Sequence, residues 1–176
     1  QVFAQILPIL GRCFCADRVH NFQSPLSFNK DKAVSSAFNL IDDAKLNEGG
    51  GATPFDLEGT ESRETFLIRQ GSLEGLLYDS YWGARDNRPS TGNYRRLAGS
   101  VTTGIFPTNL YVPPTKEGIQ IESGVSLEQV DSLDWIESTG EIVLSASGWV
   151  VQDGERKGYS SGLRVKCELL DLLRCV

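Results

Sequence analysis

The sequence predicts a mainly β protein, namely a small antiparallel barrel or sandwich of about six to eight strands behind an irregular N-terminal arm with one amphipathic helix. Two observations carry this prediction. Alternating strand patterns and turn signals appear only after Glu61, where most aromatic and β-branched residues also lie. A strong hairpin signal then joins two long strand patterns near the C-terminal end. We therefore divide the chain into an extended arm, residues 1–60, and a β-rich body, residues 61–176.

The composition limits the classes of function. The chain has 176 residues and a hydrophobic fraction of 40%, which suits one core domain plus an extension. Its net charge of −6 argues against nucleic-acid binding, because an acidic protein gains little from counterion release. We see no apolar run of about 18 residues, so we predict no membrane span, although attachment beside a membrane complex is compatible with the sequence.

The arm contains one strongly periodic segment. Residues 1–14 are apolar but interrupted by Pro8, so they predict a short helix or an extended strap. Between residues 30 and 46, apolar side chains recur at steps of three and four, which predicts a helix with Asn29 as its N-cap. A Gly-rich segment at residues 49–54 is typical of a flexible linker.

The body is predicted element by element from alternation and turn signals. The expected elements are a strand at 64–70, a loop at 85–93, a long strand at 94–106 bent at Gly99 and Gly104, a short segment at 109–112 and a strand at 118–122. The pattern does not decide between helix and strand at 73–82 or at 125–136.

The hairpin is the clearest element of the sequence. Residues 141–152 and 155–168 read as its strands, and Asp153 and Gly154 suit the positive φ angles of a type I′ turn. The apolar alternation slips at Gly148, as a β-bulge would produce. Residues 169–175 follow as a short apolar segment that predicts a helical turn.

The cysteines lie in two pairs near the two ends of the chain: Cys13, Cys15, Cys167 and Cys175. A disulfide between the arm and the C-terminal segment would close a loop of about 150 residues and stabilise the fold by several kcal/mol. Free thiols are the alternative. A zinc site fits less well, because the spacing departs from the usual pair of cysteines two to four residues apart.

No motif for catalysis, cofactors or metal ions stands out, so we predict no enzyme activity, no cofactor and no metal. The only histidine, His20, lies in the irregular arm, where no neighbour would hold it rigidly as a base. The glycines at 154, 158 and 162 surround a hairpin and not a phosphate loop. The acidic stretch from Glu117 to Glu141 does not match a calcium-binding loop.

Aromatic residues interleaved with arginine are typical of protein interfaces, and an ordinary core with solvated arginines is the alternative. The candidate partner-binding residues are Phe14, Phe22 and Phe28 of the arm and Tyr81, Trp82, Arg85, Arg88, Arg95 and Arg96 of the body. The acidic stretch from Glu117 to Glu141 would steer a partner of opposite charge. These features predict a non-catalytic accessory or assembly subunit that docks on a larger protein complex.

The absence of methionine, with Gln1 as the first residue, we interpret as a processed or trimmed form. Processing indicates import into a plastid or mitochondrion more than secretion, and a respiratory or photosynthetic complex would then be the partner. A second hypothesis is a small β-barrel that binds an apolar ligand or pigment in its interior, which would require a cavity of about 300–1,000 Å³.

Overall fold

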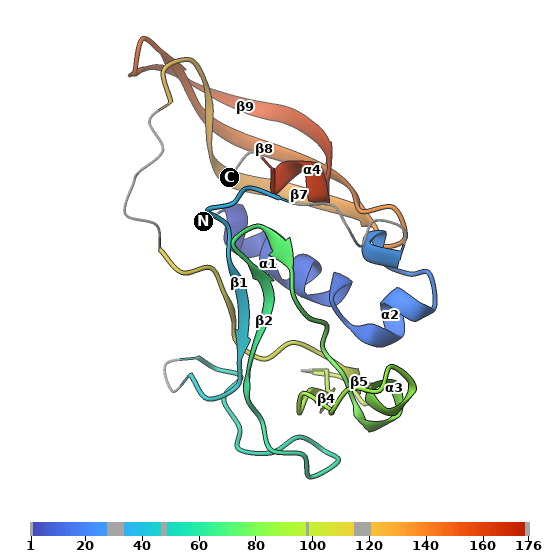
Figure 1. The fold of residues 1–176 in the computed structure, drawn as a ribbon. Coiled ribbons are helices and arrows are strands. Elements are labelled where there is room, and N and C mark those ends of the chain that lie inside the picture. The colour runs from blue at the N-terminus through green and yellow to red at the C-terminus, as the bar shows by residue number, and fades with distance from the viewer. Residues whose placement is uncertain (1, 28–33, 47–48, 98, 115–120, 175–176) are drawn as a thin grey trace.

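The structure is a computed structural model that describes residues 2–27, 34–46, 49–97, 99–114 and 121–174. The described strands form three antiparallel sheets with a few helices around them (Figure 1). The predicted mainly β character is confirmed. The prediction of a small barrel is not, because the described strands stay in separate sheets and close no barrel.

The sheets differ in size and position. The first has the strand order β3 (Ser72–Leu73), β2 (Glu64–Arg69), β1 (Leu40–Asp43) and β6 (Leu110–Tyr111). The second contains β4 (Tyr94–Arg96) and β5 (Thr103–Ile105), and the third is a meander of β7 (Gly124–Ile136), β8 (Glu141–Gln152) and β9 (Glu155–Glu168). The β4–β5 hairpin lies at the end of the molecule opposite the meander (Figure 1).

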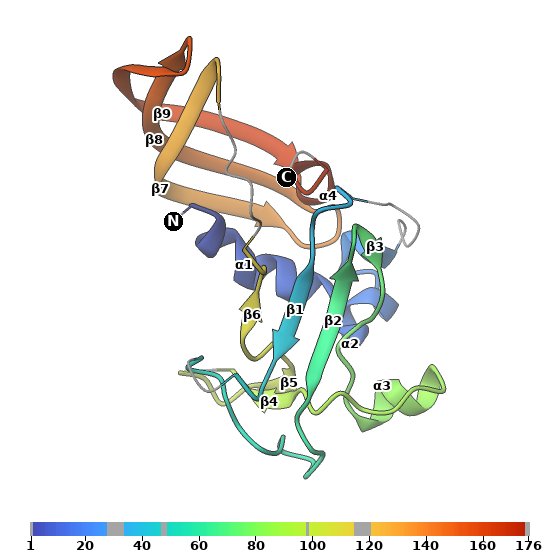
Figure 2. The ribbon, with the colours of Figure 1, turned by 60° about the vertical axis from the view of Figure 1, so that its left-hand side comes forward.

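The helices are α1 (Val2–Cys13), α2 (Ala16–His20), the 3₁₀ turn η1 (Pro25–Ser27), α3 (Ser80–Arg85) and α4 (Leu169–Leu172). Helix α1 lies between the meander and the β1–β2 pair, as Figure 1 and Figure 2 show from two directions. Its Ile6 and Leu10 belong to the same buried cluster as Leu40 of β1 and Leu144 of β8. Within the described ranges, no helix is both long and apolar enough to cross a membrane.

The described residues within the range 1–60 do not form the extended arm that we expected. Helix α1 and strand β1 both contribute to the main core, and β1 lies between β2 and β6. Ile41 of β1 stands opposite Phe66 on one side and Tyr111 on the other. The apolar surface of this segment is therefore largely covered by the rest of the chain.

The helix predicted near residues 30–46 is wrong for the described part of that range. Leu40–Asp43 is a strand in which Leu40, Ile41 and Asp42 are all buried. Apolar spacings of three and four also fit a strand that is covered on both faces, and pairing with β2 outweighs weak local helix propensity. Residues 30–33 and Asn29 lie outside the described residues.

The hairpin prediction is confirmed residue by residue. Strands β8 and β9 have the predicted ends, and Asp153 and Gly154 have φ angles of 53° and 72°. The pairing register shifts between Ala146 and Gly148, where the bulge was expected. The predicted long strand at 94–106 is instead the β4–β5 hairpin, with Gly99 at a positive φ of 72° in its turn.

Candidate functional site

The candidate site is a hollow beside the β4–β5 hairpin, and the buried carboxylate of Asp42 holds Thr108, one of the residues that line it. Oδ2 of Asp42 accepts a hydrogen bond from the side-chain amide of Asn93 at 2.8 Å. Oδ1 accepts from the backbone N–H and the hydroxyl of Thr108, at 2.6 and 3.0 Å. Burial raises the pKa of Asp42, while these hydrogen bonds act in the opposite direction. One carboxylate thus joins β1 to the residues that flank β4 and β6.

A second carboxylate, that of Asp56, holds the loop that forms one wall. Its Oδ1 accepts from the backbone N–H groups of Glu58 and Thr60, both at 2.9 Å. Its Oδ2 accepts from the backbone N–H of Tyr94 at 3.1 Å, and the N–H of Leu57 donates to the carbonyl of Tyr94 at 2.9 Å. The loop is therefore attached to the outer edge of β4.

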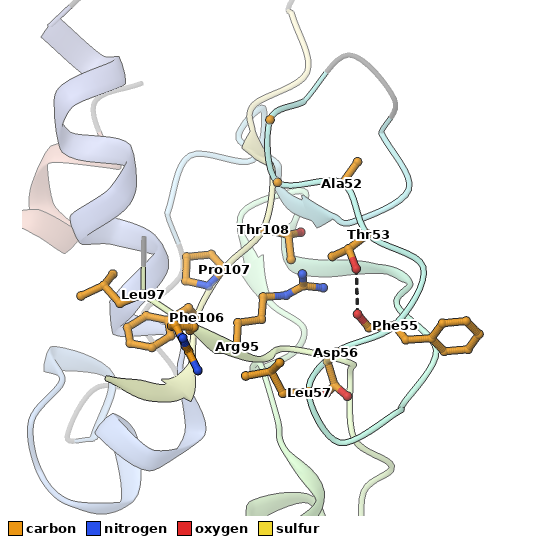
Figure 3. A pocket seen from close by; sticks show the side chains of 13 residues that line it. Ala52, Thr53, Phe55, Asp56, Leu57, Arg95, Leu97, Phe106, Pro107 and Thr108 are labelled. Carbon is orange, nitrogen blue, oxygen red and sulfur yellow. Dashed lines mark hydrogen bonds between the residues drawn. The ribbon is translucent and has the colours of Figure 1, made fainter. Parts of the chain in front are cut away.

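The Gly-rich segment that we predicted as a flexible linker continues the same wall (Figure 3). The N–H of Gly51 donates to Oδ1 of Asn109 at 2.8 Å, and Nδ2 of Asn109 donates to the carbonyl of Asp43 at 2.9 Å. A Cβ atom on Gly51 would lie 2.7 Å from the carbonyl oxygen of Thr108. Glycine therefore permits this close approach of two backbones, and residues 49–54 serve as a wall.

The hollow has a volume of about 510 Å³. It is lined by residues 50–53, 55–57, 95–97 and 106–108, and Figure 3 shows the side chain of Arg95 among them. Phe55, Leu57 and Leu97 are large apolar residues on its rim that stay 56%, 58% and 41% exposed. The site therefore combines arginine with apolar surface that this chain leaves uncovered.

Arg95 is the central charged group of the hollow. Its Nη2 donates to the hydroxyl of Ser62 at 2.9 Å and to the carbonyl of Gly92 at 3.0 Å, which are both neutral acceptors. Its Nε is buried without a hydrogen-bond partner among the described residues. Burial lowers the pKa of Arg95, with Asp42 and Asp56 acting in the opposite direction, yet an arginine stays charged near neutral pH.

The structure separates the predicted partner-binding residues. Phe14 is fully buried in the core and is not available to a partner, whereas Phe22 is 63% exposed, and Phe28 lies outside the described residues. Of the others, Tyr81, Trp82 and Arg85 lie on α3, Arg88 follows that helix, and Arg95 and Arg96 lie on β4 beside the hollow. Only the last two belong to the candidate site.

The α3 residues form a contact of their own with α2. Nε2 of His20 lies 2.8 Å from Oδ2 of Asp86, and the His20 ring stacks on Trp82 with 4.8 Å between ring centroids. The hydroxyl of Tyr78 donates to the same Asp86 oxygen at 3.0 Å. Burial, followed by this hydrogen bond, raises the pKa of Tyr78 to about 12. The cluster therefore fastens two helices together.

The cysteines are not joined within the described part of the chain. Cys13, Cys15 and Cys167 are free thiols, and Cys175 lies outside the described residues. Burial raises the pKa of Cys13 to about 12 and that of Cys15 well above its usual value. Both thiols therefore stay protonated near neutral pH, which makes them poor nucleophiles.

A family model decides what kind of protein this is: the PmbA/TldA metallopeptidase C-terminal domain matches residues 1–176. The chain belongs to this family. A curated metalloprotease PmbA homolog of Haemophilus influenzae is 28% identical over 137 residues, which cover 78% of this chain and 30% of that protein. The chain thus spans less than a third of the length of this relative.

Solved structures of the same kind share the fold. A protein of Thermotoga maritima, described as a proposed modulator of a DNA gyrase, has a TM-score of 0.84 and 26% identity, covering 96% of this chain and 41% of that one. TldE of Thermococcus kodakarensis has a TM-score of 0.82 and 22% identity with the same coverages, a likeness that concerns the fold alone. The arrangement around the hollow therefore belongs to a fold that recurs in longer proteins.

These findings overturn three predictions. The chain is not an accessory subunit of a respiratory or photosynthetic complex, because its family is a metallopeptidase domain and its relatives come from bacteria and archaea. For the same reason the predicted plastid or mitochondrial location is wrong. The hypothesis of a ligand-binding barrel is also wrong, because the chain belongs to this family and its described strands form three separate sheets. The absence of methionine misled the prediction of location.

The family name implies a metal ion, so we ask which side chains of this chain could act as metal ligands. The described residues contain no group of three or more His, Cys, Asp or Glu side chains placed to hold a metal. Cys13 and Cys15 are buried, and Nε2 of His20 lies 2.8 Å from Oδ2 of Asp86. The residues that the structure describes therefore do not fit a metal centre by themselves.

Proposed function

We propose that this chain is a non-catalytic domain of a longer PmbA/TldD-type metallopeptidase protein, in which it holds the peptide chain on which that protein acts. One observation carries the proposal. Of the three described thiols, Cys13 and Cys15 are buried, and His20 is paired with Asp86, which leaves only the partly buried Cys167 accessible among these side chains. A metal and its ligands would then be supplied outside the described residues.

The hollow supports the binding role. Its volume of about 510 Å³ lies within the range of ligand sites in proteins, about 300–1,000 Å³. Its walls are fixed by the carboxylate of Asp56 and the amide of Asn109, so that it is formed before any ligand arrives. A preformed site loses less conformational entropy on binding.

The proposal is tested with the intact protein and a labelled unfolded protein substrate. His20→Gln and Cys15→Ser should leave kcat within about twofold of wild type, because neither group contacts the reacting atoms. The amount of bound metal, measured by elemental analysis, should not change. Circular dichroism of each variant shows whether it is folded, which keeps a structural defect apart from a catalytic one.

Two results would overturn the proposal. A folded variant that loses kcat by more than about a hundredfold and also loses bound metal would place the catalytic group in this chain. The proposal would also be wrong if the intact protein hydrolyses no peptide, with or without added divalent metal, because this chain would then have no peptidase substrate to hold.

A further inference from the structure

A second hollow is formed by residues of the β2–β3 hairpin and of the segments before and after α3. Its volume is about 290 Å³, at the lower end of the range for ligand sites, about 300–1,000 Å³. It shares no lining residue with the candidate site. The residues that line it are Thr65, Leu73, Glu74, Gly75, Leu76, Tyr78, Arg88, Pro89 and Thr91. A space of this size suits a small molecule.

Hydrogen bonds hold the walls of this second hollow in place. The N–H of Tyr78 donates to Oγ1 of Thr91 at 2.8 Å, and the N–H of Thr91 donates to the carbonyl of Tyr78 at 3.1 Å. The N–H of Arg88 donates to the carbonyl of Gly83 at 2.8 Å, and a Cβ on Gly83 would lie 2.7 Å from the carbonyl oxygen of Arg88. The segments on both sides of α3 are therefore fixed before any ligand arrives, which lowers the entropy lost on binding.

The walls combine apolar surface with one unmatched positive charge. Leu73 and Leu76 are partly buried residues that pack against the main core, and Pro89 lies beside them in the lining. No described residue forms an ion pair or a side-chain hydrogen bond with the guanidinium of Arg88. Glu74 also lines the hollow, but its carboxylate is paired with Arg69. The second hollow is therefore apolar with a cation at its wall.

Two hydroxyl groups belong to the same lining. Burial, followed by the hydrogen bond to Asp86, raises the pKa of Tyr78 to about 12, and the charge of Arg88 acts in the opposite direction. Tyr78 thus stays neutral, and its hydroxyl is committed to Asp86, at 3.0 Å. By contrast, Oγ1 of Thr65 is buried without a hydrogen-bond partner among the described residues. A ligand oxygen would give this hydroxyl the partner that the chain does not supply.

We propose that the second hollow binds a small apolar carboxylic acid, with its carboxylate on the guanidinium of Arg88 and its hydrocarbon body against Leu73, Leu76 and Pro89. The flat guanidinium matches the two oxygens of a carboxylate, and the hydroxyl of Thr65 adds a donor after rotation about its Cα–Cβ bond. A phosphate would bring up to two charges to a single arginine and leave the apolar wall uncovered, so a monocarboxylate is the better match. The inference is independent of the proposed function, because these groups lie outside the candidate site.

The test is calorimetric titration of the intact protein with 4-methylpentanoate at neutral pH. We expect a dissociation constant on the order of 1 mM, as is usual for so small a ligand. The amide of the same shape, 4-methylpentanamide, should bind about tenfold more weakly because it lacks the charge. Acetate, which keeps the charge but lacks the hydrocarbon body, should also bind about tenfold more weakly.

Variants of the protein test the location. Arg88→Gln should weaken binding of 4-methylpentanoate about tenfold and leave the amide almost unchanged. Thr65→Val, which keeps the shape of the side chain, should weaken it about threefold. Arg85→Gln is the matched control, because the guanidinium of Arg85 lies 5.1 Å from the ring centroid of Trp82 and does not line the second hollow. Circular dichroism confirms that each variant is folded.

The results decide the inference without reference to peptide hydrolysis. Equal affinities for the acid and the amide, or equal effects of Arg88→Gln and Arg85→Gln, would overturn it. So would the absence of binding at about 10 mM 4-methylpentanoate, ten times the expected dissociation constant. Binding that depends on Arg88 would support it even in a protein that hydrolyses no peptide, and the proposed function would then fail alone.

Discussion

The side-chain amide of Asn93 donates a hydrogen bond to the carboxylate of Asp42 at 2.8 Å, although 51 positions separate the two residues. Both side chains are almost fully buried, and the amide also donates to the carbonyl of Phe106 at 3.1 Å. The pair therefore connects a central strand of the first sheet with the hairpin that carries the hollow. Loss of either partner would leave a polar group buried without compensation.

Replacing Asn93 by alanine should destabilise the fold by about 2–3 kcal/mol, because a buried carboxylate loses a donor. The measurement is the free energy of unfolding from a urea titration. Gln5→Ala is the control, since Gln5 is exposed on α1 and the same amide group is removed. A change no larger than that of the control would show that the Asp42–Asn93 contact contributes nothing to stability.

The stability of the protein should carry a pH dependence from Asp42. Burial raises its pKa in the folded state above the ordinary value of 3.8, so the folded protein binds the proton more tightly than the unfolded chain. The contribution of Asp42 is therefore fully present below pH 3.8 and is lost as the pH rises through the folded-state pKa.

Asp42→Asn isolates this contribution, because asparagine does not titrate. The free energy of unfolding of wild type minus that of the variant should increase as the pH falls from neutral into the acid range. Denaturant titrations at several pH values measure this difference. A difference that stays constant, or that decreases toward acid pH, would contradict the raised pKa.

Gly148 should tolerate no side chain. A Cβ atom at this position would lie 2.2 Å from the carbonyl oxygen of Ser126 and 2.8 Å from the Cα of Leu127, both in the backbone of β7. Gly148→Ala should therefore destabilise by about 1–3 kcal/mol through overpacking. Gly158→Ala in the next strand is the control, because no neighbouring atom lies within 4 Å of its added Cβ. Thermal unfolding distinguishes the two, and equal melting temperatures would contradict the tight contact.

Glu137 bridges the first two helices to the meander. It lies 3.0 Å from Nη1 of Arg18 and 3.5 Å from Nη2 of Arg12. Glu137→Gln should lower the free energy of unfolding by about 0.5–1 kcal/mol at low ionic strength and by less in high salt, because these ion pairs are partly exposed. Glu155→Gln at the exposed hairpin turn should have almost no effect. An effect of Glu137→Gln that does not depend on salt would indicate that packing, and not charge, is responsible.

The thiols should differ in reactivity. Cys13 and Cys15 are buried with raised pKa values, so alkylation of the native protein at pH 8 should leave them unmodified until it unfolds. Cys167 is only partly buried and should react first, although its pKa is also raised by burial. Mass spectrometry of the peptides after timed alkylation measures this order. Rapid native labelling of Cys15 would contradict the buried arrangement and revive a chemical role for it.

Local signals in the sequence predicted the elements that depend on local chemistry. Asp153 and Gly154 specify the hairpin turn because few residues adopt a positive φ, and Gly148 marks the bulge for a related steric reason. The same local reasoning failed for Leu40–Asp43, because the identity of this strand depends on its pairing with β2 and β6. Arg95 and Arg96 were singled out by composition, but nothing in the spacing placed Asp56 or Asn109 beside them.

By itself, therefore, the sequence determined the β-rich character and the hairpin from Glu141 to Glu168. Tertiary structure alone decided that α1 lies inside the core, that β1 is a strand, and that residues 50–53, 55–57, 95–97 and 106–108 line one hollow. The physical reason is the range of the interactions. Turn and bulge geometry involves neighbours in the chain, whereas contacts such as Asp42 with Asn93 and Gly51 with Asn109 join residues that only folding brings together.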